Sequence, residues 1–192
     1  MRVIAGEFRG RNLLPPASDI TRPVTDRVKQ SVFDILSPLI EGATVYDCFA
    51  GTGSMGLECL SRGAAAAVFF EVDHSATERL RRNIATLKVE GRSTVVATDL
   101  FKWFAAPPKA GARRADLIFL DPPYRFLNER PKDLQRLAAA FVDHLTSDGL
   151  VIFRHDAKDS LALPALAVRD VRTYGSMTVE MLGLANAAPA QP

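Results

Sequence analysis

Short apolar runs alternate with helical patterns from residue 44 onward. Runs typical of β-strands lie at 44–48, 67–71, 93–97, 116–120 and 149–154, and helical spacing lies between them at about 54–62, 75–88, 99–105 and 132–146. Alternation of this kind favours a parallel sheet covered by helices. We therefore expect an α/β fold with helices on both faces of the sheet.

The pattern changes after the fifth of these strands. Two further β-like runs, 166–173 and 176–183, are separated by only Tyr174 and Gly175, which is too short for a parallel crossover. They must therefore pair antiparallel, so we expect seven strands in a mostly parallel sheet with an antiparallel last strand. Residues 184–192 show no periodicity and are expected to form a disordered tail.

The chain ahead of the first strand predicts two smaller elements. Arg2–Ile4 and Arg11–Leu14 flank a glycine-bounded stretch and are expected to form a small hairpin. A loop with three prolines then leads to a helix over 26–37, with Val28, Val32, Ile35 and Leu36 on its apolar face. A capping box of Ser75 and Glu78 predicts the start of the helix at 75–88.

The length and composition fit one soluble domain. A chain of 192 residues with 47% hydrophobic and 24% charged residues is typical of a single globular unit. We expect a basic hairpin and loop at 1–25, a core at 26–183 and the tail at 184–192. No run approaches the roughly 18 to 20 apolar residues of a membrane helix, and the first residues lack the apolar core of a signal peptide. We therefore expect a cytoplasmic protein.

The cysteines and histidines suggest no metal site. Cys48 and Cys59 form no CxxC pair, and His74, His144 and His155 are scattered, so we expect neither a disulfide nor a zinc ion. Charge is uneven, because six basic residues against three acidic ones give the first 30 residues +3 while the whole chain carries +2. This indicates an anionic partner such as a nucleic acid, although a solvated charged face remains the alternative.

A glycine-rich loop follows the first expected strand. Gly51, Gly53 and Gly56 give the spacing of a dinucleotide-binding loop, and Glu71 stands twenty residues after Gly51, where such proteins place a ribose-binding acid. Asp47 at the strand's end argues against a dinucleotide, because a carboxylate there would repel a pyrophosphate. S-adenosylmethionine carries an ammonium and a sulfonium and no phosphate, so the loop favours this methyl donor over NAD.

Acidic residues also end the other strands of the predicted sheet. Asp47, Glu71, Asp99 and Asp121 stand at or just after the ends of successive strands. Because ligands of open α/β sheets bind outside the carboxyl ends of the strands, these acids outline one site. We expect Glu71 to hold ribose hydroxyls and Asp99 an adenine amino group, with Asp73 as a competitor for the first role and helix capping as the alternative for Asp99.

The most specific motif is Asp121-Pro122-Pro123-Tyr124, directly after an apolar strand. Two prolines remove two amide donors and stiffen the turn. The Asp121 carboxylate and the Pro122 carbonyl can then accept the two hydrogens of an exocyclic amino group, while Tyr124 offers a ring on which a base stacks. The alternative is an ordinary turn with a core tyrosine.

These motifs resemble a known family. The [DN]PP[YFW] signature is shared by class I amino-methyltransferases with a Rossmann-like sheet, and the blocks at 2–11, 21–29 and 47–53 are similar to the bacterial 16S ribosomal RNA (guanine(966)-N2)-methyltransferases. The resemblance spans roughly residues 1 to 183 and only loosely includes 174–183. It implies S-adenosylmethionine as cofactor and, as acceptor, 16S ribosomal RNA, either naked or within the assembling small subunit.

The resemblance also implies roles for individual residues. The catalytic group would be Asp121, Pro122, Pro123 and Tyr124. Cofactor contacts would come from Thr25, Asp47, Phe49, Ala50, Gly51, Thr52, Gly53, Glu71, Val72, Asp99 and Leu100. RNA contacts would come from Arg2, Arg9, Arg11 and Arg22, and Arg22 and Thr25 would belong to a lid over the cofactor.

Other functions use parts of the same pattern. An NAD-dependent oxidoreductase would account for the glycine loop and Glu71 but would leave Asp121-Pro122-Pro123-Tyr124 without a purpose. A non-catalytic RNA-binding domain would not need that motif either. Methyltransferases for adenine N6 or for a protein glutamine amide could use it, and only the N-terminal resemblance selects ribosomal RNA.

Overall fold

The computed structural model describes residues 1–16, 25–108 and 111–185. The chain divides into two compact units, Met1–Asp99 and Leu100–Pro192, and each is described here by itself. The expectation of one domain over 1–192 stays a prediction. Arg22 lies outside the described residues, as does most of the expected tail.

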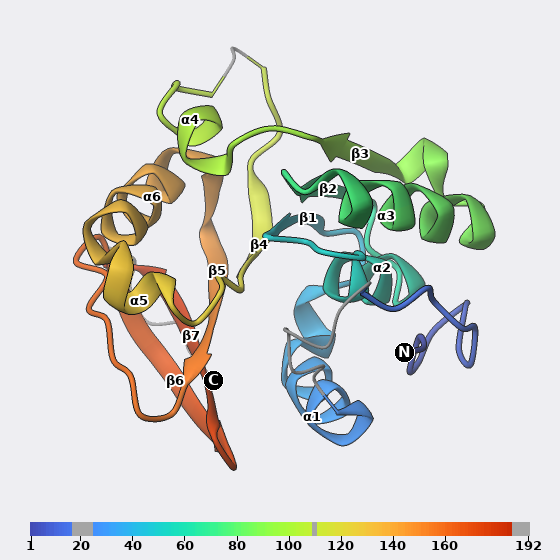
Figure 1. The fold of residues 1–192 in the computed structure, drawn as a ribbon, viewed down its shortest axis with the longest axis horizontal. Coiled ribbons are helices and arrows are strands. Elements are labelled where there is room, and N and C mark those ends of the chain that lie inside the picture. The colour runs from blue at the N-terminus through green and yellow to red at the C-terminus, as the bar shows by residue number, and fades with distance from the viewer. Residues whose placement is uncertain (17–24, 109–110, 186–192) are drawn as a thin grey trace. The chain divides into compact units, whose positions relative to one another are not determined.

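The first unit carries three parallel strands in the order β3-β2-β1 (Figure 1). They are β1 (Thr44–Cys48), β2 (Ala66–Phe70) and β3 (Ser93–Val96). The helices are α1 (Asp26–Leu36), α2 (Ser54–Ser61) and α3 (His74–Leu87), and two short 3-10 helices are η1 (Ser37–Leu39) and η2 (Glu90–Arg92). Each regular element lies within two residues of its expected bounds, because strand and helix periods differ clearly in this half of the sequence.

The buried face of α1 differs from the expected one. Val32 and Leu36 are buried as expected, but Ile35 is exposed, and the remaining buried positions are Lys29 and Phe33. Ile35 was placed on the buried face by apolar spacing alone, because Lys29 was not considered as a residue that faces inward. The expectation for Ile35 was therefore wrong.

The start of α3 also corrects the sequence analysis. Asp73 is the N-cap, and its Oδ1 accepts a hydrogen bond from the Ala76 amide at 2.7 Å. Glu78 instead pairs with Arg82 one turn later on the helix surface. The aspartate that follows the strand, and not the expected Ser75, therefore caps the helix.

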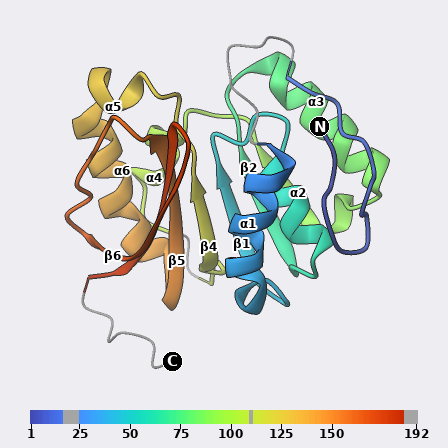
Figure 2. The same ribbon diagram turned by 90° about the horizontal axis from the view of Figure 1, so that it is seen from below.

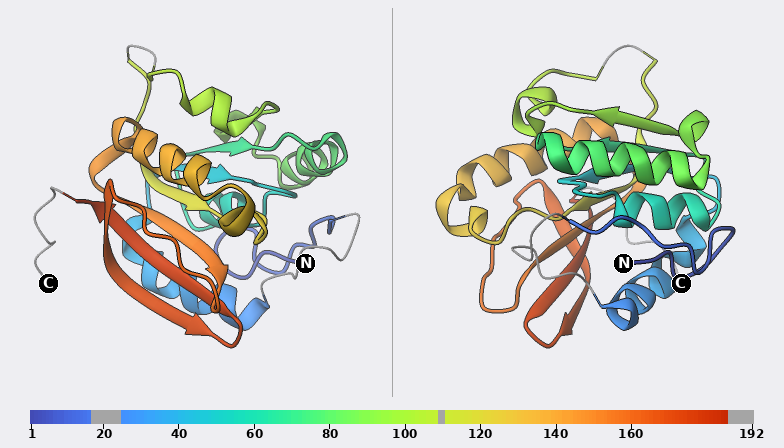
Figure 3. Two further views of the ribbon diagram at one scale, coloured as in Figure 1. Left: turned by 60° about the vertical axis from the view of Figure 1, so that its left-hand side comes forward. Right: turned by 45° about the vertical axis from the view of Figure 1, so that its right-hand side comes forward.

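The N-terminal segment forms the expected small hairpin. Arg2 and Asn12 make an antiparallel bridge, and the Gly10 amide donates to the Val3 carbonyl at 2.9 Å. The right-hand view of Figure 3 shows this segment running along α2. The hairpin has few ladder bonds of its own, so its position depends on contacts with the rest of the first unit.

The second unit contains α4 (Leu100–Phe104), β4 (Ala115–Leu120), α5 (Phe126–Glu129), α6 (Pro131–His144), β5 (Leu145–Asp156), β6 (Leu166–Tyr174) and β7 (Met177–Leu184). Figure 2 shows α6 and α4 on one side of β5. β4 and β5 pair in parallel, and β7 pairs antiparallel with both β5 and β6. The seven expected strands are thus present, and the last one is antiparallel as predicted.

Two features of the second unit differ from the sequence analysis, namely the length of β5 and the presence of α5. β5 begins at Leu145, directly after α6, and its pairing with β4 shifts register between Ala115 and Leu117. The four-residue α5 was not expected, because one helical turn has too few positions to show a period. No helix in the described parts of the chain is long and apolar enough to cross a membrane.

Candidate active site

The glycine-rich loop of the first unit turns sharply from β1 into α2. Phe49 adopts a left-handed conformation with φ of 62°, which is uncommon for a residue with a bulky side chain. Gly53, the N-cap of α2, has φ of 83°, and a Cβ there would lie 2.4 Å from Leu80 Cδ1. Position 53 therefore requires glycine for both its backbone conformation and its space. Strain of this kind is typical of ligand-binding loops.

The buried Asp47 side chain holds the C-terminal end of this loop. Its side chain is only 2% exposed, and Oδ2 accepts a hydrogen bond from the Gly56 amide in the first turn of α2 at 2.8 Å. The negative charge also lies at the favourable end of the helix dipole. A direct contact between Asp47 and a ligand stays a prediction, whereas its hold on the loop is a feature of the structure.

Glu71 reaches the loop from the end of β2. Its Oε2 accepts a hydrogen bond from the Gly51 amide and its Oε1 one from the Asp73 amide, both at 2.8 Å. Because Asp73 caps α3, Glu71 is the better placed of the two acids for a ligand beside the loop. Val72 between them is 72% exposed, so its apolar side chain is available for contact.

The remaining expected cofactor residues differ in accessibility. Ala50, Thr52 and Leu100 are buried, and Phe49 and Asp99 are partly exposed. Thr25 is exposed and is the N-cap of α1. Thr25, Phe49, Val72 and Asp99 are therefore more accessible than the buried members of this group. Each of these assignments stays a prediction.

The Asp121-Pro122-Pro123-Tyr124 turn joins β4 to α5 in the second unit. The carbonyls of Pro123 and Tyr124 accept hydrogen bonds from the Phe126 and Leu127 amides at 2.8 and 3.2 Å. The turn therefore uses its last two carbonyls for α5. Pro122 is buried, and a contact of its carbonyl with the acceptor group stays a prediction.

Sequence reasoning missed the ion partner of Asp121. Arg154 of β5 donates through Nε to Oδ1 at 2.6 Å and through Nη2 to Oδ2 at 2.5 Å. The register explains the pair, since Leu120 lies opposite Phe153 in the parallel ladder and the next residue of each strand follows side by side. An arginine that ends the apolar run Val151-Ile152-Phe153 was the available signal.

The expected RNA-binding arginines differ in their surroundings. Arg9 and Arg11 are exposed on the hairpin, and within the described residues no carboxylate lies within ion-pair distance of either. Arg2 is paired, with its Nε 2.8 Å from Asp26 Oδ2. Lys29 contributed to the basic count of the first 30 residues, but it is 3% exposed and cannot contact an external phosphate.

Lys29 instead belongs to a buried cluster around Glu58 of α2. Glu58 is fully buried and accepts hydrogen bonds from the Ile4 and Ala5 amides at 2.8 and 3.0 Å, besides ion pairs with Lys29 and Arg62. Burial acts to raise the pKa of Glu58, but the charge of Lys29 and the hydrogen bonds from the Ile4 amide, Lys29 and Arg62 outweigh it and lower the pKa. Burial lowers the pKa of Lys29.

The Glu58 cluster and two further side chains attach the hairpin to the loop region. Ser61 Oγ accepts from the Phe8 amide at 2.9 Å and donates to the Ala5 carbonyl at 2.6 Å. Asn83 of α3 accepts from the Leu14 amide at 2.8 Å and donates to the Thr52 carbonyl at 2.9 Å. The backbone that carries Arg9 and Arg11 is thereby fixed relative to the glycine loop.

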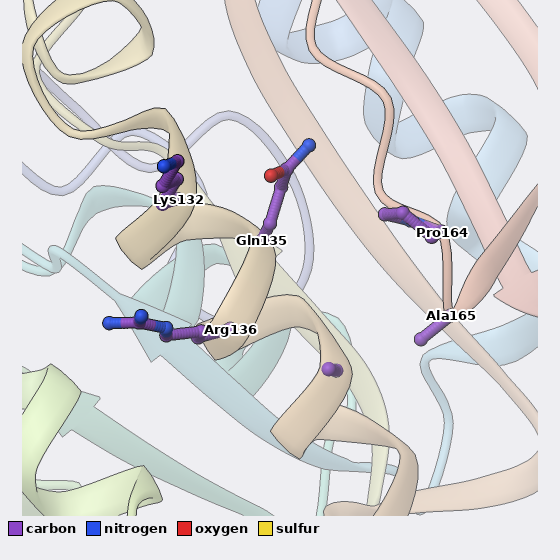
Figure 4. A pocket seen from close by; sticks show the side chains of 6 residues that line it. Lys132, Gln135, Arg136, Pro164 and Ala165 are labelled. Atoms are coloured by element: carbon purple, nitrogen blue, oxygen red, sulfur yellow. The ribbon is translucent and has the colours of Figure 1, made fainter.

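A surface depression of about 570 Å³ lies elsewhere in the second unit. Figure 4 shows it between α6 and the segment at Pro164 and Ala165. Lys132, Gln135 and Arg136 line its helical side. It contains none of the expected site residues and is open to solvent, so it is not the candidate active site.

Metal and thiol chemistry find no support in the described residues. No group of three His, Cys, Asp or Glu side chains among them is placed to hold a metal ion. Cys48 and Cys59 are buried, and burial raises the pKa of both thiols well above the ordinary value. His144 and His155 are buried within the second unit.

The chain is similar to named RNA methyltransferases. Bacillus subtilis YlbH, named as an rRNA methyltransferase, is 35% identical over 179 residues, which cover 91% of this chain and 94% of YlbH. Ribosomal RNA small subunit methyltransferase D of Escherichia coli is 42% identical over 125 residues, 65% of this chain. The match spans 61% of the Escherichia coli protein's length.

Solved structures share the fold. The Escherichia coli protein yhhF, described as a methyltransferase, superposes with a TM-score of 0.81 at 30% identity and covers 96% of this chain and 97% of its own. An RNA methyltransferase of Salinibacter ruber, solved with S-adenosyl-L-homocysteine, gives a TM-score of 0.64 at 18% identity over 88% of this chain and 97% of its own. The fold is thus the expected class I methyltransferase fold. The family model described as conserved hypothetical protein 95 matches residues 1–183, and the chain belongs to this family.

Proposed function

We propose that the protein transfers a methyl group from S-adenosylmethionine to the N2 amino group of a guanine in 16S ribosomal RNA. The observation that carries the choice of cofactor is the pair of carboxylates on the glycine loop. Gly51 and Gly56 donate their amides to Glu71 and Asp47. In dinucleotide sites such amides bind the pyrophosphate. Here two of them already hold carboxylates, which disfavours NAD and suits a cationic ligand without phosphate.

The residues of the loop fit such a ligand. A Cβ built at Gly51 would meet no atom within 4 Å, so the backbone is open to a close approach at that position. Glu71, fixed by two amides, retains lone pairs for ribose hydroxyls, and Val72 offers an apolar surface for the adenine ring. When bound, the cofactor would supply an electrophilic methyl group on a sulfonium.

The second unit supplies groups for the acceptor amine. A guanine amino group is a poor nucleophile because its lone pair is delocalised into the ring. If Asp121 and the Pro122 carbonyl accept its two hydrogens, the lone pair is directed away from both, and the positive charge that develops on nitrogen is stabilised. Alignment of this kind supplies roughly 7 to 11 kcal/mol. In the transfer the amine nitrogen would gain the methyl carbon that the sulfonium loses, and the amine would release one proton to water.

Tyr124 and the hairpin would bind the RNA. A target base must leave its stack, at a cost of about a few kcal/mol. Stacking on the partly exposed Tyr124 ring would return roughly 1 to 3 kcal/mol of this. Arg9 and Arg11 are the leading candidates for phosphate contacts, because they are exposed and carry no ion partner among the described residues. A ribosomal RNA substrate also supports the cytoplasm as the site of the reaction.

The ribosomal RNA assignment rests on the named relatives, and adenine N6 is the second candidate because a tRNA adenine-N6 methyltransferase of Shewanella loihica is 27% identical over 133 residues. One experiment separates them. The protein is incubated with labelled methyl donor and either naked 16S RNA or immature small subunits, and the RNA is digested to nucleosides. We expect label in N2-methylguanosine. Label in N6-methyladenosine would overturn the guanine assignment, and no transfer to either substrate would overturn the proposed activity.

A further inference from the structure

We propose that Arg154 is a positioning residue for the reaction, which holds the Asp121 carboxylate in the one orientation that accepts the amine. This inference rests on the proposed function. The pair is bidentate, with Nε on Oδ1 at 2.6 Å and Nη2 on Oδ2 at 2.5 Å. A carboxylate that accepts two parallel hydrogen bonds from a guanidinium loses its freedom to rotate about its terminal bond. Asp121 is therefore fixed before any substrate arrives.

The sheet restrains the backbone at the Arg154 end of the pair. Arg154 lies in the middle of a three-strand arrangement, in which β5 pairs with β4 on one side and with β7 on the other. Its partner across the antiparallel ladder is Val179, and its Nη1 contacts Met177 Sδ at 3.7 Å. The guanidinium thus lies between Asp121, which directly follows β4, and Met177 of β7, and the Arg154 backbone is held in the ladder with β7.

The exposure of the pair distinguishes it from a surface ion pair. The side chains of Arg154 and Asp121 are 17% and 23% exposed. They are sheltered enough for the interaction to be stronger than in water, and open enough for the free lone pairs of Asp121 to meet a ligand. Each carboxylate oxygen can accept a further hydrogen bond beside the one from Arg154.

The ion pair preorganises the Asp121 carboxylate, which Asp121 alone could not do. An unrestrained aspartate at a strand end would have to be ordered when the base binds, and that ordering would raise the barrier to transfer. With Arg154 in place, the acceptor oxygen is preorganised, which is the condition under which an electrostatic contact lowers a barrier most effectively. Arg154 acts through Asp121 and is not required to touch the base.

The test compares single-turnover methyl transfer by Arg154→Ala and Arg154→Lys with that of the wild type. Arg154→Ala should lower the rate by about tenfold to a hundredfold, since a misplaced contact costs up to about that factor. Arg154→Lys keeps the charge but loses the fork, so it should recover only part of the rate. Cofactor and RNA dissociation constants should stay within about twofold of the wild type, because neither ligand is held by Arg154.

The double variant supplies the decisive measurement. If Arg154 acts through Asp121, then Asp121→Ala with Arg154→Ala should transfer no more slowly than Asp121→Ala alone. Arg172→Ala is the matched control, because Arg172 pairs with Asp170 in the exposed strand β6 and should leave the rate unchanged. Arg154→Lys keeps the test open should Arg154→Ala fold poorly.

Three results would overturn the inference. A wild-type rate in Arg154→Ala would show that the pair is not needed, and an equal further loss in the Asp121→Ala background would show that Arg154 acts independently. A weakened RNA affinity with a flatter salt dependence would make it a phosphate contact. In all three cases the wild type still transfers methyl. Absence of transfer by the wild type would instead remove the proposed function on which the inference depends.

Discussion

The Lys29 ammonium and the Glu58 carboxylate form an ion pair of 3.0 Å between side chains that are 3% and 0% exposed. Replacing Glu58 by alanine should therefore lower the free energy of unfolding by about 3 to 5 kcal/mol, because it leaves a buried cation without its partner. Urea denaturation followed by circular dichroism measures this. The control is Glu78→Ala, whose exposed pair with Arg82 should contribute less than about 1 kcal/mol. Equal losses in the two variants would contradict the prediction.

The carboxylates on the glycine loop predict a selective loss of cofactor binding. Asp47→Ala releases the Gly56 amide and Glu71→Ala releases the Gly51 amide. Each should weaken binding of S-adenosylhomocysteine by at least about tenfold, or roughly 1.4 kcal/mol, as measured by isothermal titration. RNA affinity should change little. Glu90→Ala, at an exposed carboxylate of η2, is the control, and unchanged affinity in both loop variants would refute this placement of the cofactor.

The chemistry of the Asp121 turn is tested by substitutions at Asp121 and Tyr124. Asp121→Asn should retain cofactor binding but slow single-turnover transfer by about a hundredfold to a thousandfold, as when one preorganised hydrogen-bond partner is lost. Tyr124→Ala should weaken RNA capture by about 1 to 3 kcal/mol, whereas Tyr124→Phe should keep the stacking ring and most of the activity. Full activity in Asp121→Asn would exclude the proposed mechanism.

The exposed hairpin arginines predict salt-dependent RNA binding. Changing Arg9 and Arg11 to alanine should lower RNA affinity and reduce the slope of log K against log salt by about 0.7 to 0.9 for each lost contact. Filter binding over a salt series measures the slope. Arg82→Ala is the control, since its charge is paired with Glu78. If the slope does not change, the two arginines are only a solvated surface.

His155 predicts a pH-dependent part of the stability. Its hydrogen bond with Glu180 raises its pKa, against the effect of burial. The folded protein therefore holds this proton more tightly than the unfolded chain does. The contribution is complete below the unfolded pKa of about 6.5 and is lost as the pH rises through the higher folded value. Glu180→Gln should thus cost most at about pH 5.5 and little at about pH 8.5, as measured by urea denaturation at each pH. A constant difference would contradict this.

Local patterns in the sequence predicted most of the fold. The strands, the turn at Asp121 and the glycine loop each depend on neighbouring residues, whose period or backbone limits are visible in a short window. The expected cap of α3 was wrong because the capping-box pattern selects Ser75 with Glu78, whereas Asp73 caps the helix without such a partner. Ile35 was wrong because the inward-facing lysine of α1 finds its partner in another helix.

Contacts between distant residues were beyond this reasoning. Arg154 lies 33 residues from Asp121 in the sequence, and Glu58 lies 54 residues from Ile4, whose amide donates a hydrogen bond to it. No spacing rule connects such positions; only the register of β4 and β5 and the packing of α2 bring them together. The left-handed backbone of Phe49 was also not predicted, because a phenylalanine by itself favours a negative φ.

The way in which the hairpin is attached has a consequence for how such proteins diversify. Glu58 and Ser61 bind the backbone amides of Ile4, Ala5 and Phe8, and not their side chains. Docking of the hairpin therefore places little demand on the residue types at those positions. The exposed Arg9 and Arg11 can be exchanged for other side chains while the anchor beneath them persists. The exposed surface of the hairpin can thus change without disturbing the glycine loop to which the same anchor is joined.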